Sequence, residues 1–172
     1  MAERPRGITR ATSQEGVAHG GDLDQARVRF PGAPEPWIDL STGINPEPYP
    51  VPDLGEDVWA RLPQPSDVRR LQEAARRRYG AQRADQVTCA PGTQAIIQVL
   101  PTLVPPGAVQ VLGPTYGEHA AAWRRAGHDV SEVRDIAALG GAGVRVVVVV
   151  NPDNPTGRVV PASVLRDLAG RL

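Results

Sequence analysis

The residues of this chain that could do chemistry gather in three short loops, and the first loop is Ala90–Gln94. Here Gly92 would let the backbone approach a ligand closely, and Thr93 offers a hydroxyl. A helix is expected to begin at Thr93, and the free amides at a helix N-terminus favour an anion. The loop therefore predicts a phosphate site. The alternative is an ordinary strand-to-helix turn in which Thr93 is the N-cap.

The second loop, Gly113–Tyr116, follows an expected strand and carries an aromatic residue to its carboxyl end. At that position the ring of Tyr116 would be able to stack on a planar ligand. The alternative is that the same ring packs in the core.

The third loop, Asn151–Gly157, directly follows a run of valines. Pro152 and Pro155 stiffen it, and Asn154 presents an amide at the edge of the expected sheet. That amide would donate a hydrogen bond to an oxygen of a flat cofactor, with its carbonyl left for another donor. The alternative is a turn-rich connection without a ligand.

The other motifs in the sequence do not indicate a binding or catalytic site. Gly140–Gly143 precedes a strand instead of following one, so it is no dinucleotide fingerprint. His19, His119 and Cys89 lack the spacing of metal ligands, and we expect no metal site. All 19 basic residues are arginines, so these 172 residues cannot complete chemistry that needs a lysine amine.

The elements that must position the loops alternate between strands and helices. Strands are expected at 86–90, 108–112, 129–133 and 144–150, and helices at 66–79, 93–103, 116–126 and 161–172. Repeated β-α-β units imply a mostly parallel sheet with helices on both faces, which is a three-layer α/β/α fold. In such sheets ligands bind beyond the carboxyl ends of the strands, where all three loops lie. The valine run, 144–150, should be buried on both faces.

The 65 residues before these units lack the alternating pattern of strands and helices. Residues 1–35 are expected to form a loose N-terminal arm, and residues 36–65 an extended strap with a short helix at 53–61. Residues 66–172 hold the alternating units, and resemblance to a known family implies that they are the N-terminal part of a larger, ligand-binding domain. Its first helix should have Ser66 as N-cap and Gly80 as its stop, with an arginine-rich solvated face.

Composition excludes several classes of protein. The 19 acidic and 19 basic residues give a formal net charge of +0, which argues against a nucleic-acid or membrane-surface binder that acts by bulk electrostatics. No run of 18 apolar residues is present, so no membrane span is expected. A single cysteine is typical of a reducing compartment, and we expect a cytoplasmic protein.

Taken in order, the three loops resemble those of the fold type I pyridoxal-phosphate enzymes, the aspartate aminotransferase superfamily. Within that superfamily the chain is similar to the threonine-phosphate decarboxylases of cobalamin synthesis, with the histidinol-phosphate aminotransferases as near relatives. The segments that carry the narrower resemblance are His19–Gly21, Ile38–Pro46, Ala90–Ala95 and Tyr116–His119.

The resemblance implies pyridoxal 5′-phosphate as cofactor and assigns residues to it. Gly92, Thr93 and Gln94 would hold the cofactor phosphate, Tyr116 would stack on the pyridine ring, and Asn154 would bind its phenolic oxygen. The substrate would be a small phosphorylated amino acid. The resemblance implies that it is bound by Asn154, by the backbone of Gly43 and Ile44, and by the side chain of His19. A homodimer is implied as well.

The sequence also departs from the family's pattern. Relatives often carry a tyrosine before the proline at Leu62-Pro63 that reaches the neighbouring subunit's phosphate, and leucine cannot do this. The family's covalently bound lysine has no counterpart here, so no catalytic residue is assigned. By analogy with the family, strands that would pair the sheet edges are also absent, so residues 1–172 alone should be inactive and prone to aggregate. The alternatives to a decarboxylase are an aminotransferase of the histidinol-phosphate type and a non-catalytic chain.

Overall fold

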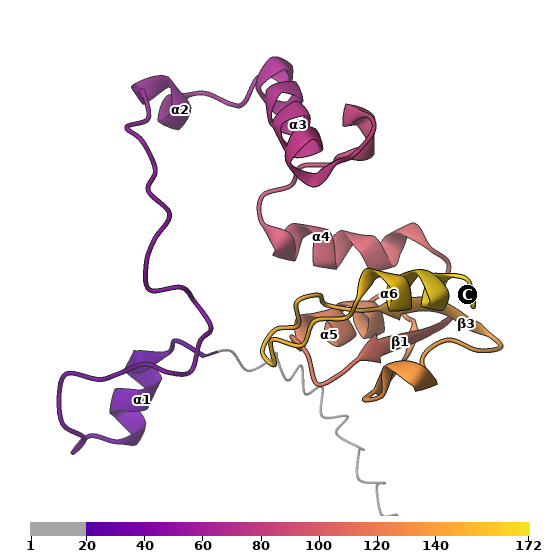
Figure 1. Ribbon diagram of the computed structural model, residues 1–172. Coiled ribbons are helices and arrows are strands. Elements are labelled where there is room, and N and C mark those ends of the chain that lie inside the picture. The colour runs from indigo at the N-terminus through magenta and orange to yellow at the C-terminus, as the bar shows by residue number, and fades with distance from the viewer. Residues whose placement is uncertain (1–19) are drawn as a thin grey trace, which may run out of the picture. The chain divides into compact units, whose positions relative to one another are not determined.

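The computed structural model describes residues 20–172 of the chain (Figure 1). By its internal contacts the chain divides into two compact units, Met1–Thr42 and Gly43–Leu172. The boundaries expected from the sequence, after residues 35 and 65, stay predictions. Within residues 20–172 no helix is both long and apolar enough to cross a membrane.

The described part of the first unit contains a helix that the sequence analysis missed. Helix α1 (Leu23–Arg29) lies in the segment expected to be a loose arm. Asp22 caps it by accepting a 2.9 Å hydrogen bond from the amide of Gln25. An acidic first turn and a basic last turn also suit the helix dipole, and this local chemistry accounts for the helix.

The second unit is built on a three-stranded parallel sheet, which confirms the expected α/β class. Its strands are β1 (Ala108–Leu112), β2 (Asp129–Val133) and β3 (Val144–Val148), in the order β2-β1-β3. Both strand pairs are parallel, with Val109 opposite Val130 on one side and Val146 on the other.

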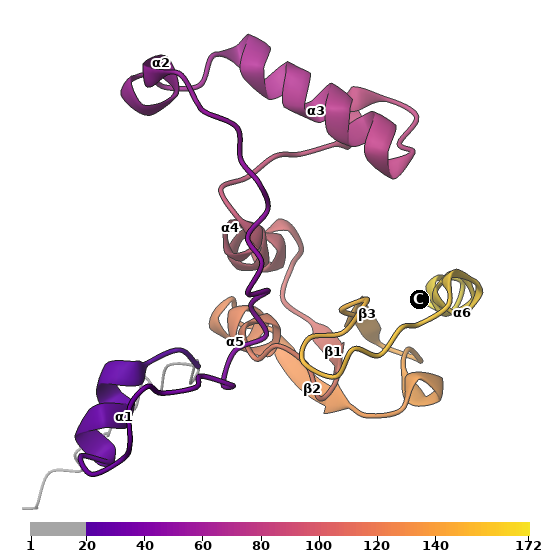
Figure 2. The same ribbon diagram turned by 60° about the vertical axis from the view of Figure 1, so that its left-hand side comes forward.

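Helices cover both faces of this sheet, so the predicted three layers are present (Figure 2). On one face Val109 and Val111 pack against Ala120 and Trp123 of α5 (Glu118–Arg125). On the other face, Leu112 belongs to a second cluster that includes Leu168 of α6 (Ala162–Ala169). Neighbouring residues of a strand point to opposite faces, and β1 therefore serves both clusters.

Strand β3 ends two residues earlier than expected and is less buried. Its valines pack into both clusters, Val146 and Val148 into one and Val147 into the other, yet all three are only half-buried. Among the described residues β3 pairs with β1 alone, so one side of it stays open.

The prediction of a strand at 86–90 is wrong. A 3₁₀ turn (Ala84–Gln86) occupies its start, and residues 87–90 have no regular structure. A strand needs a neighbour, and no described strand pairs with this segment. The carbonyl of Val87 instead accepts a 2.8 Å hydrogen bond from Gln72 Nε2.

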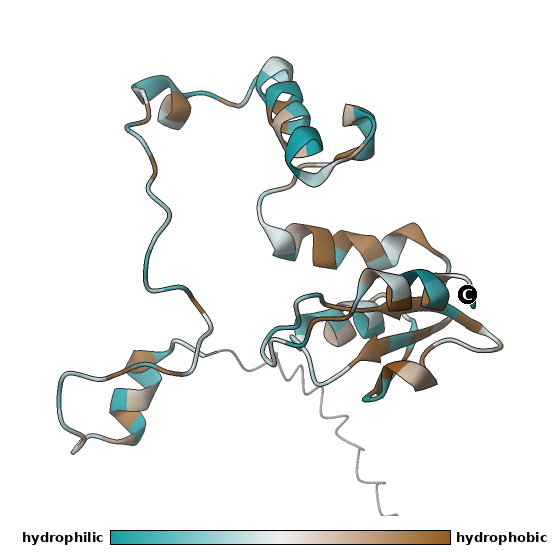
Figure 3. Cartoon of the chain, viewed as in Figure 1, coloured by the Kyte–Doolittle hydropathy of each residue, from teal (hydrophilic) through white to brown (hydrophobic). Residues whose placement is uncertain are grey.

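Helix α3 (Pro65–Tyr79) begins one residue before the predicted start, with Gln64 and not Ser66 as its N-cap. Proline is favoured in a first turn, and Asp67 Oδ2 accepts a 2.9 Å hydrogen bond from the Gln64 amide. Gly80 ends the helix at φ 73°, as predicted. The helix is largely hydrophilic, in contrast to the apolar helix α4 (Thr93–Val99) (Figure 3).

The remaining helices are shorter than predicted. Helix α4 spans Thr93–Val99 and continues as a 3₁₀ turn, Leu100–Leu103, where Pro101 lacks the amide that an α-helix needs. Helix α2 covers only Glu56–Ala60 of the strap. Helices α5 and α6 lose one to three residues at each end. A further 3₁₀ turn spans Ile136–Ala138.

Candidate functional site

All five residues expected to bind a cofactor line one pocket of the second unit. Its volume is about 420 Å³, within the range of about 300–1,000 Å³ that is usual for small-molecule sites. The lining residues are Gly92, Thr93, Gln94, Ile97, Tyr116, His119, Val150 and Asn154. The three loops are therefore brought together in space, although 62 positions separate Gly92 from Asn154.

The start of α4 forms the first side of the pocket. Gly92 is the N-cap at φ 83° and ψ 161°, a conformation that is nearly restricted to glycine. Thr93 is the first helical residue and makes no capping bond, so the alternative in which it is the N-cap is wrong. The first-turn amides of a helix lack intrahelical partners, and here the helix start has no side-chain cap while its first residues, Thr93 and Gln94, line the pocket.

Gln94 is fixed by a buried carboxylate behind the pocket. Its Nε2 donates to Glu118 Oε2 at 3.1 Å, and Glu118, which is 7% exposed, also pairs with Arg125 at 3.3 Å. This contact joins α4 to α5. The side-chain amide of Gln94 is thus engaged within the protein, and its backbone amide is the group that a ligand would meet.

Tyr116 lies at the second side of the pocket, beside a histidine that the sequence analysis did not assign to the site. The ring of His119 meets that of Tyr116 edge-on, with centroids 6.2 Å apart and planes at 84°. Burial lowers the pKa of His119 below its ordinary value of 6.5, so the imidazole is neutral near pH 7. The signal that could have found it was the place of His119 in the first turn of α5, three residues after Tyr116.

The third side is the loop that carries Asn154. Asn151 closes this loop on itself, because its side chain donates to Val160 O at 3.0 Å and accepts from Val160 N at 2.9 Å. Within residues 20–172 the side-chain amide of Asn154 has no hydrogen-bond partner and is exposed to the pocket. It is available to a ligand.

The predicted substrate-binding residues are placed only in part. A Cβ atom on Gly43 would lie 4.0 Å from Asn154 Oδ1, so the strap passes next to the pocket at this point. The side chain of Ile44 is 79% exposed and does not line the pocket. His19 lies outside the described residues.

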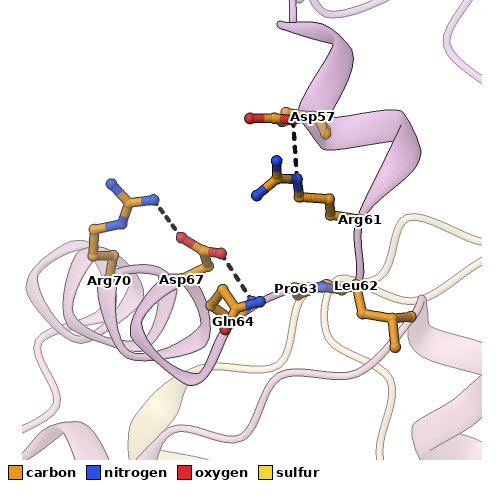
Figure 4. Close-up of a pocket in the computed structure, with 8 residues that line it drawn as sticks. Asp57, Arg61, Leu62, Pro63, Gln64, Asp67 and Arg70 are labelled. Carbon is orange, nitrogen blue, oxygen red and sulfur yellow. Dashed lines mark hydrogen bonds and ion pairs between the residues drawn. The ribbon is translucent and has the colours of Figure 1, made fainter.

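A larger hollow lies between α2 and α3, far in sequence from the three loops (Figure 4). Its volume is about 590 Å³, but its charged groups are already paired with each other, Arg61 with Asp57 and Arg70 with Asp67. These pairs are exposed, and no predicted site residue lines the hollow. We therefore take the smaller pocket as the candidate site.

Chemically, the candidate site suits a flat molecule that carries an anion at one end. Backbone amides and the Thr93 hydroxyl meet at the start of α4, an aromatic ring stands beside them, and an amide side chain lies opposite. The described lining contains no arginine, so this part of the site would bind an anion through dipoles and not through charge.

Comparison with known proteins assigns the class. A family model, aminotransferase class I and II, matches residues 51–171, and the chain belongs to this family. Its members depend on pyridoxal phosphate.

Three individual proteins of known or probable activity are similar to this chain in sequence. The chain is 43% identical to a threonine-phosphate decarboxylase from Sinorhizobium sp, over 90% of this chain and 46% of that one. It is 46% identical to a threonine-phosphate decarboxylase from Pseudomonas aeruginosa, over 87% and 44%. A probable aminotransferase from Mycobacterium tuberculosis is 31% identical, over 84% and 38%.

A solved structure supports the fold. The crystal structure of L-threonine-O-3-phosphate decarboxylase from Porphyromonas gingivalis matches with a TM-score of 0.59 at 19% identity, covering 66% of this chain and 37% of that one. The chain spans less than half the length of the two decarboxylases it matches in sequence.

Proposed function

We propose that this chain forms the cofactor-binding part of a pyridoxal-phosphate-dependent L-threonine O-3-phosphate decarboxylase. One observation carries the proposal: the five residues expected to bind the cofactor line a single pocket, in a chain 43% and 46% identical to two threonine-phosphate decarboxylases. The reaction breaks the bond between Cα and the carboxylate, releases carbon dioxide and adds a proton at Cα to give aminopropanol phosphate.

Each side of the pocket has a part in binding. The amides of Thr93 and Gln94 and the Thr93 hydroxyl hold the cofactor phosphate, which Gly92 permits to approach the backbone. Tyr116 stacks on the pyridine ring, and Asn154 donates a hydrogen bond to the phenolic oxygen. When bound, the cofactor withdraws electrons from the bond that breaks.

The substrate would enter from the side of the strap. Gly43, and with it the backbone of Ile44, meets the substrate carboxylate close to Asn154. His19 binds the substrate phosphate. The amine that holds the cofactor covalently must come from outside these 172 residues, because they contain 19 arginines and no lysine. A homodimer, a cytoplasmic location and a place in cobalamin synthesis belong to the same proposal.

An aminotransferase is the second candidate, favoured by the family match and by the relative from Mycobacterium tuberculosis. The same pocket would serve it, because the two reactions share the cofactor and differ in which bond at Cα breaks. The residues that would separate them on the substrate side are not among those that line the pocket.

Turnover separates the two candidates. The natural protein, purified at full length from its source cells, is given pyridoxal 5′-phosphate and carboxyl-labelled L-threonine O-3-phosphate, with and without 2-oxoglutarate. A decarboxylase releases labelled carbon dioxide whether or not 2-oxoglutarate is present. Keto-acid formation that requires 2-oxoglutarate, without carbon dioxide, would establish the aminotransferase, and no turnover of either kind would favour a non-catalytic chain.

A further inference from the structure

The loop that carries Asn154 contains a buried acid that the proposed reaction does not use. The side chain of Asp153 is 0% exposed. Its Oδ2 accepts hydrogen bonds from the hydroxyl and the amide of Thr156, and Arg158 lies 4.0 Å away across the loop. A carboxylate this deeply buried is costly unless it is paired and hydrogen-bonded, so its position needs an explanation.

The partner of this acid reaches a second loop of the pocket. Arg158 donates through its two terminal nitrogens to the carbonyls of Leu112 and Gly113, each at 3.4 Å. Those carbonyls end β1 and begin the loop that leads to Tyr116. Thr115, in that loop, donates to the carbonyl of Asn154 at 3.4 Å. The two loops are therefore tied together twice.

The charge of Asp153 belongs to this connection. Burial alone would raise the pKa of the carboxyl group. Hydrogen bonds from Thr115 and Thr156 and the charge of Arg158 outweigh burial, and the pKa lies below its ordinary value of 3.8. At neutral pH the group is an anion, and its Oδ1, which accepts no hydrogen bond within the described residues, faces the Arg158 guanidinium at 4.0 Å.

We propose that Asp153 and Arg158 form a positioning pair that fixes Asn154 and Tyr116 relative to each other, so that both meet the ring of one bound pyridoxal phosphate. This inference rests on the proposed function. The pair would act on the side of the pocket that meets the cofactor ring. Within the described residues neither Asp153 nor Arg158 is bonded to the start of α4, where the phosphate would bind.

The test compares two ligands on the full-length protein. Asp153→Asn and Arg158→Gln each remove one partner, Arg158→Lys keeps the charge but not the two-pronged contact, and Asp167→Asn on the exposed face of α6 is the matched control. We expect the first two variants to bind pyridoxal 5′-phosphate about tenfold more weakly, because each leaves a charge of the pair without its partner, and to bind inorganic phosphate as the wild type does. Arg158→Lys should recover part of the loss.

Hydrogen exchange of the ligand-free protein supplies a readout that does not depend on the cofactor. In Asp153→Asn and Arg158→Gln, amides of residues 113–116 and 154–157 should exchange faster, and those of 93–99 should not change. Unchanged exchange at 113–116 would overturn the pairing of the loops, as would equal losses for both ligands. If the wild type binds no pyridoxal 5′-phosphate, the proposed function is overturned. Hydrogen exchange would then still show whether Asp153 and Arg158 hold the two loops together. Should Asp153→Asn fail to fold, Arg158→Gln decides both points.

Discussion

At the scale of single residues, Asn151 and Asn154 stand three positions apart and have opposite roles. Asn151 makes two hydrogen bonds with Val160, whereas the Asn154 side chain makes none within the described residues. We expect Asn151→Ala to lower the free energy of unfolding by about 1–3 kcal/mol, because it leaves backbone groups of Val160 unpaired. Asn154→Ala should leave stability within about 0.5 kcal/mol of the wild type, as for a surface change.

The same two variants should differ in their affinity for pyridoxal 5′-phosphate. Asn154→Ala should weaken pyridoxal 5′-phosphate binding about tenfold, because it removes a hydrogen bond to the ring oxygen. Fluorescence titration and urea unfolding of the two proteins check both halves of the prediction. Equal affinity in Asn154→Ala and the wild type would show that this side chain is not a cofactor ligand.

The pH dependence of stability is a second prediction at this scale. The folded-state pKa of Asp153 lies below its ordinary value of 3.8, so its contribution to stability is fully present above that value. The contribution is lost as the pH falls from there toward the lowered pKa. Urea unfolding at pH 7, 5 and 3 should show a smaller loss of stability toward pH 3 in Asp153→Asn than in the Asp167→Asn control. Parallel curves for the two variants would contradict it.

At the scale of elements, the start of α4 offers a paired test with glycines. Gly92 and Gly127 have φ of 83° and 86°, and a Cβ on either would meet no atom within 4 Å. Alanine at either position should therefore be destabilising, by about 1–3 kcal/mol, through backbone strain alone.

Only one of the two glycines lines the pocket. We expect Gly92→Ala to lose affinity for inorganic phosphate and Gly127→Ala to keep it, as measured by isothermal titration calorimetry. If both variants lose it equally, strain and not local geometry governs binding, and the phosphate assignment to α4 fails.

The elements also show what the sequence could and could not predict. Strands β1, β2 and β3 were predictable because each contains two or more valines, and two of the site loops follow from the strands that precede them, β1 and β3. The strand at 86–90 was not, because strand formation depends on a partner elsewhere in the chain. Helix α1 was missed because the cap at Asp22 stands in a segment rich in turn-forming residues.

Within the site, the sequence was informative about residues and not about their neighbours. Loop chemistry identified Gly92, Thr93, Tyr116 and Asn154, all of which line the pocket. Neither the buried Glu118 behind Gln94 nor the Asp153–Arg158 pair was predicted. Glu118 bonds to Gln94 on another helix, and Arg158 bonds to carbonyls at the end of β1, and such long-range contacts leave no local pattern in the sequence.

At the scale of the whole molecule, large apolar side chains lie on the surface. Trp59 is 78% exposed and Leu62 is 86% exposed, and the outer edge of β3 has no partner within the described residues. We expect residues 1–172 produced alone to aggregate and to lack activity, because exposed apolar patches and open edges associate. Size-exclusion chromatography with light scattering measures this.

A matched variant sharpens the prediction. Replacing Trp59 and Leu62 by glutamine removes apolar surface without touching the pocket, so the double variant should aggregate less. A monomeric, cooperatively melting wild-type chain of 172 residues would contradict the expectation, and decarboxylase activity from it would do so more strongly.

The most direct test of the account is a crystal structure of the full-length natural protein with pyridoxal 5′-phosphate. We expect the phosphate within hydrogen-bond distance of the Thr93 and Gln94 amides, the ring stacked on Tyr116, and its phenolic oxygen bonded to the Asn154 side chain. A cofactor bound elsewhere, such as between α2 and α3, or a ring that contacts neither Tyr116 nor Asn154, would contradict it.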